Sequence, residues 1–335
     1  TLSILQHARA LELRTDQMRR LIADAQVLAT SPLVSVIIPV FNGADYIAQS
    51  IASVLAQTYT NYEILVINDG STDEGATRAV VEKVLRNVAP ALAGKIRYLE
   101  KPNGGVSTAL NLGIDEMRGD FFAWLSHDDL FHPDKLRLQI EFWRRNLHAR
   151  IIGCSHAVLD ANGTMVSEHK VPANTVLRRP RDFLGFWVFG CGLLIHRSCF
   201  ADGLRFNPEN RYVQDYEMFY DLVRTIPFYY VPETLVYWRQ HGQVVKRDLV
   251  DRQQGINQER SNSMLFTALL TRHDIASFHP ATIKSAELVP ESRRVADVVA
   301  QLDLVRQALL NHGAFEAGAI CAEATLVTLG GTHAQ

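Results

Sequence analysis

Residues 121–129 constrain the fold more than any other part of the sequence. Five apolar residues, 121–125, run without a break, and the adjacent carboxylates of Asp128 and Asp129 follow them. A continuous apolar run of this length indicates a strand that is buried on both faces of a sheet. In open α/β sheets, ligands bind just beyond the carboxyl ends of such strands. Neighbouring carboxylates at this position suit Mg²⁺ or Mn²⁺, and they are equally typical of a turn before a helix start.

Strands and helices are predicted to alternate four times in the first part of the chain. Apolar and β-branched runs predict strands at 34–40, 63–68, 96–99 and 121–125, and helices are predicted between them. Short connections between alternating elements imply a parallel sheet with helices on both faces. We therefore predict an α/β fold in which polar residues meet at the carboxyl ends of the strands.

The alternation loosens after residue 150. A hairpin is predicted around the turn at 160–163, and a further strand is expected to end at His196. A helix is predicted over 212–224, and a short strand at 228–231 follows it.

Both ends of the chain are predicted to be helical. Residues 1–31 carry an imperfect heptad pattern, which fits a helix packed on its own domain or on a partner helix. Only helical segments are predicted beyond residue 248, so self-association or contact with a neighbouring domain is expected through these ends. The expected units are an N-terminal helix (1–31), a main domain (32–247, with halves 32–130 and 131–247) and a helical extension (248–335).

Composition and charge narrow the functional classes. The formal net charge of -2 gives no electrostatic case for nucleic acid as the main partner. Four cysteines without metal-ligand spacing favour a reduced, cytoplasmic protein, with a peripheral position at the inner face of the membrane as an alternative. The sequence contains neither a P-loop motif nor a GxGxxG motif, which argues against a P-loop NTPase and a nicotinamide dehydrogenase. Any bound phosphates must therefore be held by a metal and by side chains.

Four landmarks, in order along the chain, resemble family 2 glycosyltransferases with the GT-A fold. They are residues 36–42, 66–73, 103–113 and 126–135, and they follow predicted strands. The resemblance extends over about residues 33–245, or roughly two thirds of the chain. It implies transfer of a sugar from a nucleotide diphosphate donor, with inversion at the anomeric carbon. A UDP-sugar is the expected donor, and a hydroxyl of a saccharide or glycolipid is the expected acceptor, in surface polysaccharide synthesis.

The resemblance assigns nucleotide contacts to the ends of the predicted strands. Asp69 would accept a hydrogen bond from the imide N–H of uracil or thymine, an edge that suits a carboxylate because it only accepts. A turn acid is the alternative role for Asp69. The other implied nucleotide contacts are Pro39, Val40, Phe41, Asn42, Asn103, Gly105, Ser126 and His127.

The metal segment departs from the family's usual Asp-x-Asp pattern because Ser126 occupies its first position. We therefore place Mn²⁺ or Mg²⁺ on Asp128, and we expect the missing carboxylate to weaken metal binding. Asp129 is a second ligand or an orienting group. His241 is implied as a metal or diphosphate contact, with a surface histidine as the alternative. The other residues assigned to the donor sugar or to orientation are Asn111, Arg239 and Glu217.

Asp215 is the expected catalytic base. Gln214 and Asp215 stand where similar proteins have a Glu-Asp pair that opens a helix. An inverting displacement needs one carboxylate to take the proton of the acceptor hydroxyl, while metal and nearby cations stabilise the leaving diphosphate. The helix start and the missing Glu charge predict a lowered pKa for Asp215. Glu217 is the second candidate for the base.

The apolar, glycine-rich stretch 183–192 is either part of the core or the wall of the acceptor site. The resemblance favours a wall that includes Trp187, Cys191 and Gly192, and the lack of a QxxRW element argues against a processive synthase. A second interpretation is a degenerate sugar-nucleotide-binding domain that scaffolds a larger glycosyltransferase, which the departures at Ser126 and Gln214 would favour. A nucleotidyltransferase would need a basic loop after the first strand, which the sequence lacks.

Overall fold

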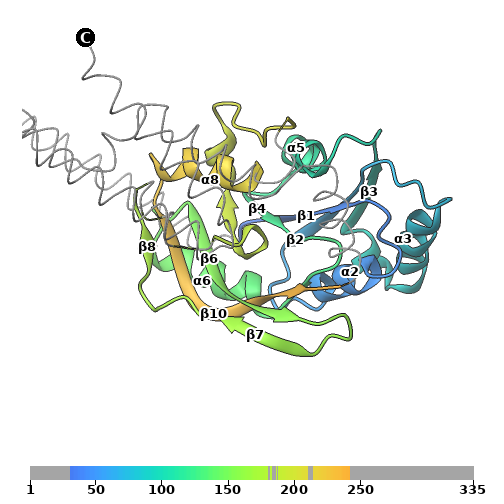
Figure 1. Ribbon diagram of the computed structural model, residues 1–335, viewed down its shortest axis with the longest axis horizontal. Coiled ribbons are helices and arrows are strands. Elements are labelled where there is room, and N and C mark those ends of the chain that lie inside the picture. The colour runs from blue at the N-terminus through green and yellow to red at the C-terminus, as the bar shows by residue number, and fades with distance from the viewer. Residues whose placement is uncertain (1–30, 180–181, 183–185, 187, 210–213, 242–335) are drawn as a thin grey trace, which may run out of the picture.

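The computed structural model describes residues 31–241, except 180–181, 183–185, 187 and 210–213 (Figure 1). The predicted N-terminal helix and the helical extension beyond residue 248 lie outside the described residues, and so does Trp187. The division of the chain into units therefore stays a prediction.

The first half of the sheet is parallel, as predicted. Its strands are β1 (Val34–Val40), β2 (Tyr62–Asn68), β3 (Ile96–Glu100) and β4 (Phe121–Trp124), in the order β3-β2-β1-β4. All residues of β1, β2 and β4 are buried, which explains why their sequences are nearly continuous apolar runs. Three polar residues are exceptions: Ser35 Oγ donates to Glu63 Oε1 at 2.6 Å, and Asn68 Nδ2 donates to Tyr98 Oη at 2.8 Å.

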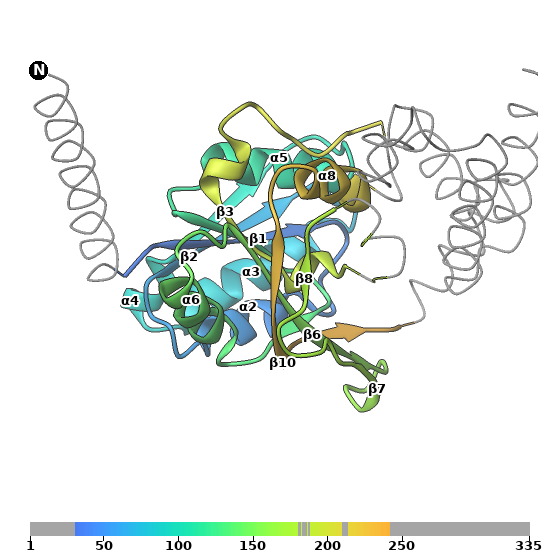
Figure 2. The same cartoon turned by 90° about the vertical axis from the view of Figure 1, so that its left-hand side faces the viewer.

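Helices cover both faces of this sheet. Figure 2 shows α5 (Val106–Glu116) and α8 (Gln214–Val223) over one face, and α2 (Ile47–Leu55), α3 (Ala76–Asn87), α4 (Pro90–Ala93) and α6 (Lys135–Arg145) on the other. Gly113 lets α5 approach β1 closely, because a Cβ atom there would lie 2.4 Å from Ile37 Cγ2. Among the described residues, no helix is long and apolar enough to cross a membrane.

The second half makes the sheet mixed. Strand β9 (Leu194–His196) runs antiparallel to both β4 and β6 (Ile151–Leu159), and β6 pairs in parallel with β10 (Phe228–Arg239). The short strand β8 (Val176–Leu177) pairs antiparallel with the start of β10, and the short strand β5 (Leu130–Phe131) pairs antiparallel with a later part of it. Two single-turn 3₁₀ helices, η1 (Gly190–Gly192) and η2 (Arg197–Phe200), stand on either side of β9.

Strand β10 is longer than the predicted strand at 228–231. Its pairing with β6 shifts register between Val231 and Thr234, around Pro232, which cannot donate to a sheet hydrogen bond. Ser155 of β6 donates from its hydroxyl to the carbonyl of Pro232 at 2.8 Å, so the irregular backbone is satisfied. The strand therefore continues past the irregularity and ends at Arg239, which is buried.

The predicted hairpin is confirmed. β6 and β7 (Met165–His169) pair antiparallel around a turn in which Asp160 Oδ1 accepts the backbone N–H groups of Asn162 and Thr164, both at 2.9 Å. Gly163 has φ 86°, a left-handed conformation that suits glycine. The hairpin projects from the body of the molecule in both views (Figures 1 and 2).

Candidate active site

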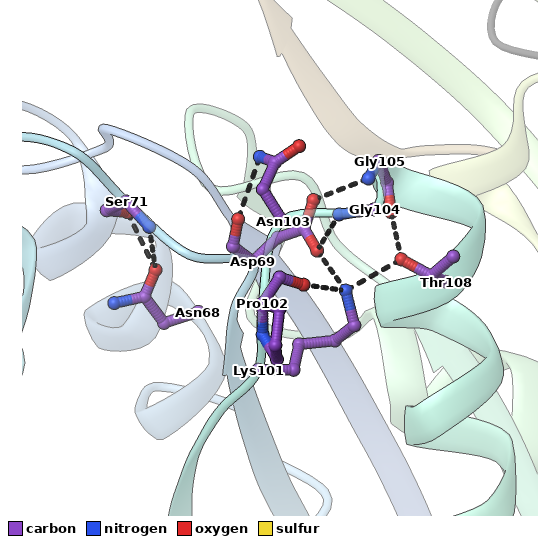
Figure 3. A network of polar contacts seen from close by, with 9 residues as sticks. All are labelled: Asn68, Asp69, Ser71, Lys101, Pro102, Asn103, Gly104, Gly105 and Thr108. Carbon is purple, nitrogen blue, oxygen red and sulfur yellow. Dashed lines mark hydrogen bonds and ion pairs between the residues drawn. The ribbon is translucent and has the colours of Figure 1, made fainter.

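Asp69, directly after β2, is an acidic residue whose carboxylate is bound on several sides by protein donors. Asp69 is 3% exposed, and its carboxylate accepts the backbone N–H groups of Gly104 at 3.1 Å and Gly105 at 2.7 Å (Figure 3). Lys101, just beyond β3, forms an ion pair with Asp69 and donates to Thr108 Oγ1 at 2.8 Å. The predicted base-binding carboxylate is thus held in one orientation by the start of α5.

Asn103 belongs to the same cluster. Its Nδ2 donates to the carbonyl of Asp69 at 2.9 Å, which ties the loop after β3 to the loop after β2 (Figure 3). Gly105 has φ 84°, and this conformation turns its N–H toward the Asp69 carboxylate. Lys101 and Gly104 were not singled out in the sequence, although a cation directly after a strand was a usable signal.

The loop after β1 stands beside this cluster. Asn42 adopts φ 49°, its N–H donates to Ser71 Oγ at 2.9 Å, and its Oδ1 accepts the N–H of Thr72 at 2.8 Å. Pro39 and Val40 are buried in β1, so only their backbone can reach a ligand. Phe41, by contrast, is 42% exposed. It directly follows Val40, whose carbonyl accepts the N–H of Asp69 at 2.8 Å.

Asp128 meets His241 just beyond the end of β4. The distance from Asp128 Oδ2 to His241 Nε2 is 2.9 Å, although the two residues are 113 positions apart in the sequence. Both side chains are largely buried, and the His241 ring lies 4.7 Å from the ring of Tyr46. The structure therefore brings together the two residues that were assigned to the metal.

Asp129 and Arg239 fix this arrangement. Asp129 is 1% exposed, and its Oδ1 accepts the backbone N–H of Arg239 at 3.0 Å. Burial, and then the charge of Asp128, raise the pKa of Asp129 well above its usual range. Arg239 Nε donates to the carbonyl of Asp128 at 3.1 Å. Asp128 and Asp129, in the loop after β4 that was predicted to bind a metal, are thus fixed to the end of β10.

The guanidinium group of Arg239 is buried and reaches two further elements. It donates to Gln49 Oε1 on α2 at 2.9 Å and to the carbonyl of Ala161 in the hairpin turn at 3.3 Å, and it lies over the ring of Tyr46. These contacts direct it toward α2 and the hairpin. A diphosphate contact, as expected from the sequence, would have to use its remaining N–H donors.

The predicted acceptor wall adjoins the metal loop. Ser126 Oγ lies 3.4 Å from Cys191 Sγ, and the carbonyl of Gly192 accepts from Gln139 Nε2 at 2.8 Å. Cys191 is buried, and burial raises the pKa of its thiol well above its usual range. The ring of His127 packs against Gly43, where a Cβ atom would lie 2.5 Å from His127 Cδ2. The backbone around Ser126 is therefore fixed from two sides.

Asp215 lies in the first turn of α8 and is partly buried. Burial raises its pKa to about 6, even though Oδ1 accepts the N–H of Tyr216 at 2.9 Å. The expectation of a lowered pKa was therefore wrong, because desolvation outweighs the favourable helix start. The neighbouring Gln214 is 7% exposed, and its Oε1 has no hydrogen-bond partner in the described part of the chain.

Two residues assigned to the donor sugar or to the base make contacts with the segment before α8. Asn111 of α5 exchanges hydrogen bonds with the backbone of Phe206, both at 2.8 Å. Asn207 Nδ2 donates to both carboxylate oxygens of Glu217, at 3.1 and 3.2 Å. In this arrangement, the amide of Asn111 and the carboxylate of Glu217 bind protein groups.

The Asp128–His241 pair is suited to share a divalent cation with a diphosphate. Among the described residues, no three His, Cys, Asp or Glu side chains form a metal-binding cluster. A pair is nevertheless sufficient when substrate phosphates complete the coordination shell, since Mg²⁺ is commonly bound by one or two carboxylates together with phosphate oxygens. The residues present therefore fit a metal that binds with the donor.

The parallel half with acidic groups at its strand ends, joined to a mixed second half, defines the GT-A class of glycosyltransferase folds. The S. aureus TarS 1-349 crystal structure has this fold: its TM-score is 0.52 at 16% identity, with 82% of this chain and 80% of that chain covered. The chain belongs to glycosyl transferase family 2, whose family profile matches residues 35–204.

Two relatives illustrate the range of the family. An uncharacterized glycosyltransferase of Rickettsia felis is 38% identical over 218 residues, which cover 63% of this chain and 35% of that protein. A chondroitin synthase of Escherichia coli is 28% identical over 144 residues, which cover 43% of this chain and 20% of that protein. The chain thus spans about a third of the length of the first relatives that it matches.

Proposed function

We propose that the chain is a metal-dependent, inverting glycosyltransferase that moves a sugar from a UDP-sugar to a hydroxyl of a saccharide or glycolipid acceptor. The observation that carries this proposal is the Asp128–His241 pair at the end of β4, in the same row of strand ends as the clasped Asp69. Such an arrangement would hold the diphosphate and the base of one nucleotide together.

The cluster around Asp69 favours a uracil base. Uracil presents an imide N–H, which needs an acceptor, and Asp69 would supply one because a carboxylate only accepts. Lys101 holds this carboxylate in place, since its ammonium donates to Asp69, Thr108 and the carbonyl of Pro102. The exposed ring of Phe41 would stack on the base.

Asp128 and His241 would hold the metal, and a nitrogen ligand suits Mn²⁺ better than Mg²⁺. When bound, the cation would supply positive charge to the departing diphosphate. Asp215 would remove the proton of the acceptor hydroxyl as its oxygen bonds to the anomeric carbon. The bond between that carbon and the phosphate oxygen breaks at the same time, and UDP leaves with the bonding electrons.

Two substitutions test this division of roles. Asp128→Ala should abolish the Mn²⁺-dependent gain in UDP affinity, measured by calorimetry with and without Mn²⁺. Asp215→Asn should retain UDP affinity and lose two to four orders of magnitude in sugar transfer, roughly 3–5 kcal/mol of barrier. Asp202→Asn, which changes an exposed aspartate, is the matched control. An active Asp215→Asn enzyme, or unchanged Mn²⁺ dependence in Asp128→Ala, would contradict the proposal.

A relative named chondroitin synthase supports a saccharide acceptor and a role in polysaccharide synthesis. A panel of nucleotide sugars, scored by melting temperature with and without Mn²⁺, would identify the donor, because a ligand that binds the folded state raises that temperature.

The alternative is a degenerate domain that binds a sugar nucleotide and scaffolds a larger glycosyltransferase. The observations that favour it are Ser126 in the metal segment and the neutral Gln214 beside Asp215, whose Oε1 finds no hydrogen-bond partner among the described residues. Selective donor binding without hydrolysis or transfer at any pH would decide for this alternative.

A further inference from the structure

We infer that Asn111, Asn207 and Glu217 form a positioning strut that holds the first turn of α8, and with it Asp215, against α5. This inference rests on the proposed role of Asp215 as the base. It assigns Glu217 to orientation and removes it from the candidates for the base.

The strut begins at α5. Asn111 uses both ends of its amide on one residue, because Nδ2 donates to the carbonyl of Phe206 and Oδ1 accepts its N–H, both at 2.8 Å. The pairing resembles a short piece of β-ladder between a side chain and a backbone that are 95 residues apart in sequence. It fixes the position of residue 206 relative to α5.

The side chain of Phe206 fixes the same residue against the sheet. It is 1% exposed, and its ring packs against Phe122 and Trp124 of β4, with ring centroids 6.4 and 6.2 Å apart. Arg205 adds an ion pair to Asp115 of α5 at 2.6 Å. The segment is therefore attached to α5 and to the strand that leads into the metal loop.

Asn207 carries the connection on to α8. Its Oδ1 accepts the N–H of Glu209 at 3.0 Å, so its Nδ2 is left to face Glu217, where it donates to both carboxylate oxygens. Hydrogen bonds to a carboxylate are stronger than those between neutral groups. The first turn of α8 is therefore held through Glu217.

Helix geometry separates the roles of Glu217 and Asp215. Residues two apart on a helix do not face the same side. Since Glu217 faces Asn207, Asp215 projects from a different side of the turn. Holding one side fixes the direction of the other, and a displacement of about 1 Å at a reacting group can cost about 10²-fold in rate.

The helix α5, which carries Asn111, also begins at the residues that bind Asp69, because the N–H groups of Gly104 and Gly105 donate to its carboxylate. The group proposed to bind the base of the donor and the proposed catalytic base are thus linked through one helix and one short segment. We expect the strut to set the transfer rate and to leave donor affinity unchanged.

The test uses the full chain with UDP for binding and UDP release from UDP-glucose and UDP-N-acetylglucosamine for rate. Glu217→Leu and Asn207→Leu should each lower kcat about tenfold or more, with UDP affinity and melting temperature close to the original values. Glu217→Gln keeps a carbonyl acceptor for Asn207 and should stay within about threefold of the original rate. Asn87→Leu, at an exposed asparagine at the end of α3, is the control.

The rate loss of the double variant Asn207→Leu/Glu217→Leu should be smaller than the product of the two single losses, because both single variants remove the contact between Asn207 and Glu217. If Glu217→Gln is as slow as Glu217→Leu, the carboxylate acts chemically and the inference is wrong. Full activity in both leucine variants would also overturn it. An active Asp215→Asn enzyme would instead show that the proposed base is wrong, so the two failures can be told apart.

Discussion

The pH dependence of sugar transfer should report the burial of Asp215. Its pKa is raised to about 6, and a base removes a proton only in its ionised form. A group with this pKa is about 90% ionised at pH 7 and about 10% ionised at pH 5. The rate should therefore fall about tenfold between pH 7 and pH 5. A base with the ordinary value of 3.8 would lose less than about a tenth of its activity over the same interval.

The assay is the initial rate of UDP release from pH 5 to 8 at constant ionic strength. Donor and Mn²⁺ must be saturating at each pH, because protonation of metal ligands weakens metal binding. Repeating the series at twice the Mn²⁺ concentration checks this condition. Glu217→Gln should keep the midpoint near pH 6, since it leaves the titrating group in place. A flat profile down to pH 5, or a midpoint that moves in Glu217→Gln, would refute the argument.

Two further predictions concern the body of the fold. Lys135 is fully buried, and burial lowers its pKa from 10.5 to about 8. Between these two pH values the unfolded state binds more protons than the folded state, so the free energy of unfolding rises with pH. Lys135→Met should remove a gain of about 2 kcal/mol between pH 7 and 9.5, measured by urea unfolding; an unchanged slope would contradict the buried charge. Gly113→Ala should lose about 1–3 kcal/mol of unfolding free energy, because the new Cβ would meet Ile37, whereas Gly94→Ala meets only ordinary contacts and should be neutral.

The first half of the fold could be predicted because its strands are buried on both faces. In β1 and β4, every residue is buried, which accounts for the nearly continuous apolar runs in their sequences. The two-residue strands β5 and β8 are too short to carry a periodic pattern, and they were missed. The predicted strand at 228–231 stops just before Pro232, whereas in the structure pairing with β6 continues β10 past this proline.

The candidate site was predictable where it lies directly beyond a strand. Asp69 and Asp128 follow β2 and β4, so position alone pointed to them. The raised pKa of Asp215 was not predictable, because burial depends on distant parts of the chain. The pairing of Asn111 with Phe206 joins residues 95 positions apart and leaves no local pattern. The resemblance to the family located His241, but its partner Asp128 became visible only in the folded structure.

The pairing of Asp128 with His241 also sets the order in which the site is completed during synthesis. A ribosome adds roughly 5–20 residues each second, so His241 is made about 6–23 s after Asp128. Strands β5 and β6 are made before β10, which comes to lie between them, so their edges stay open until it arrives. A nascent chain thus contains Asp69 and Asp128 before it can complete the proposed metal site. Under the proposed function, only a chain that includes His241 could bind the metal together with its donor, and the same delay exposes two unpaired strand edges to neighbouring chains.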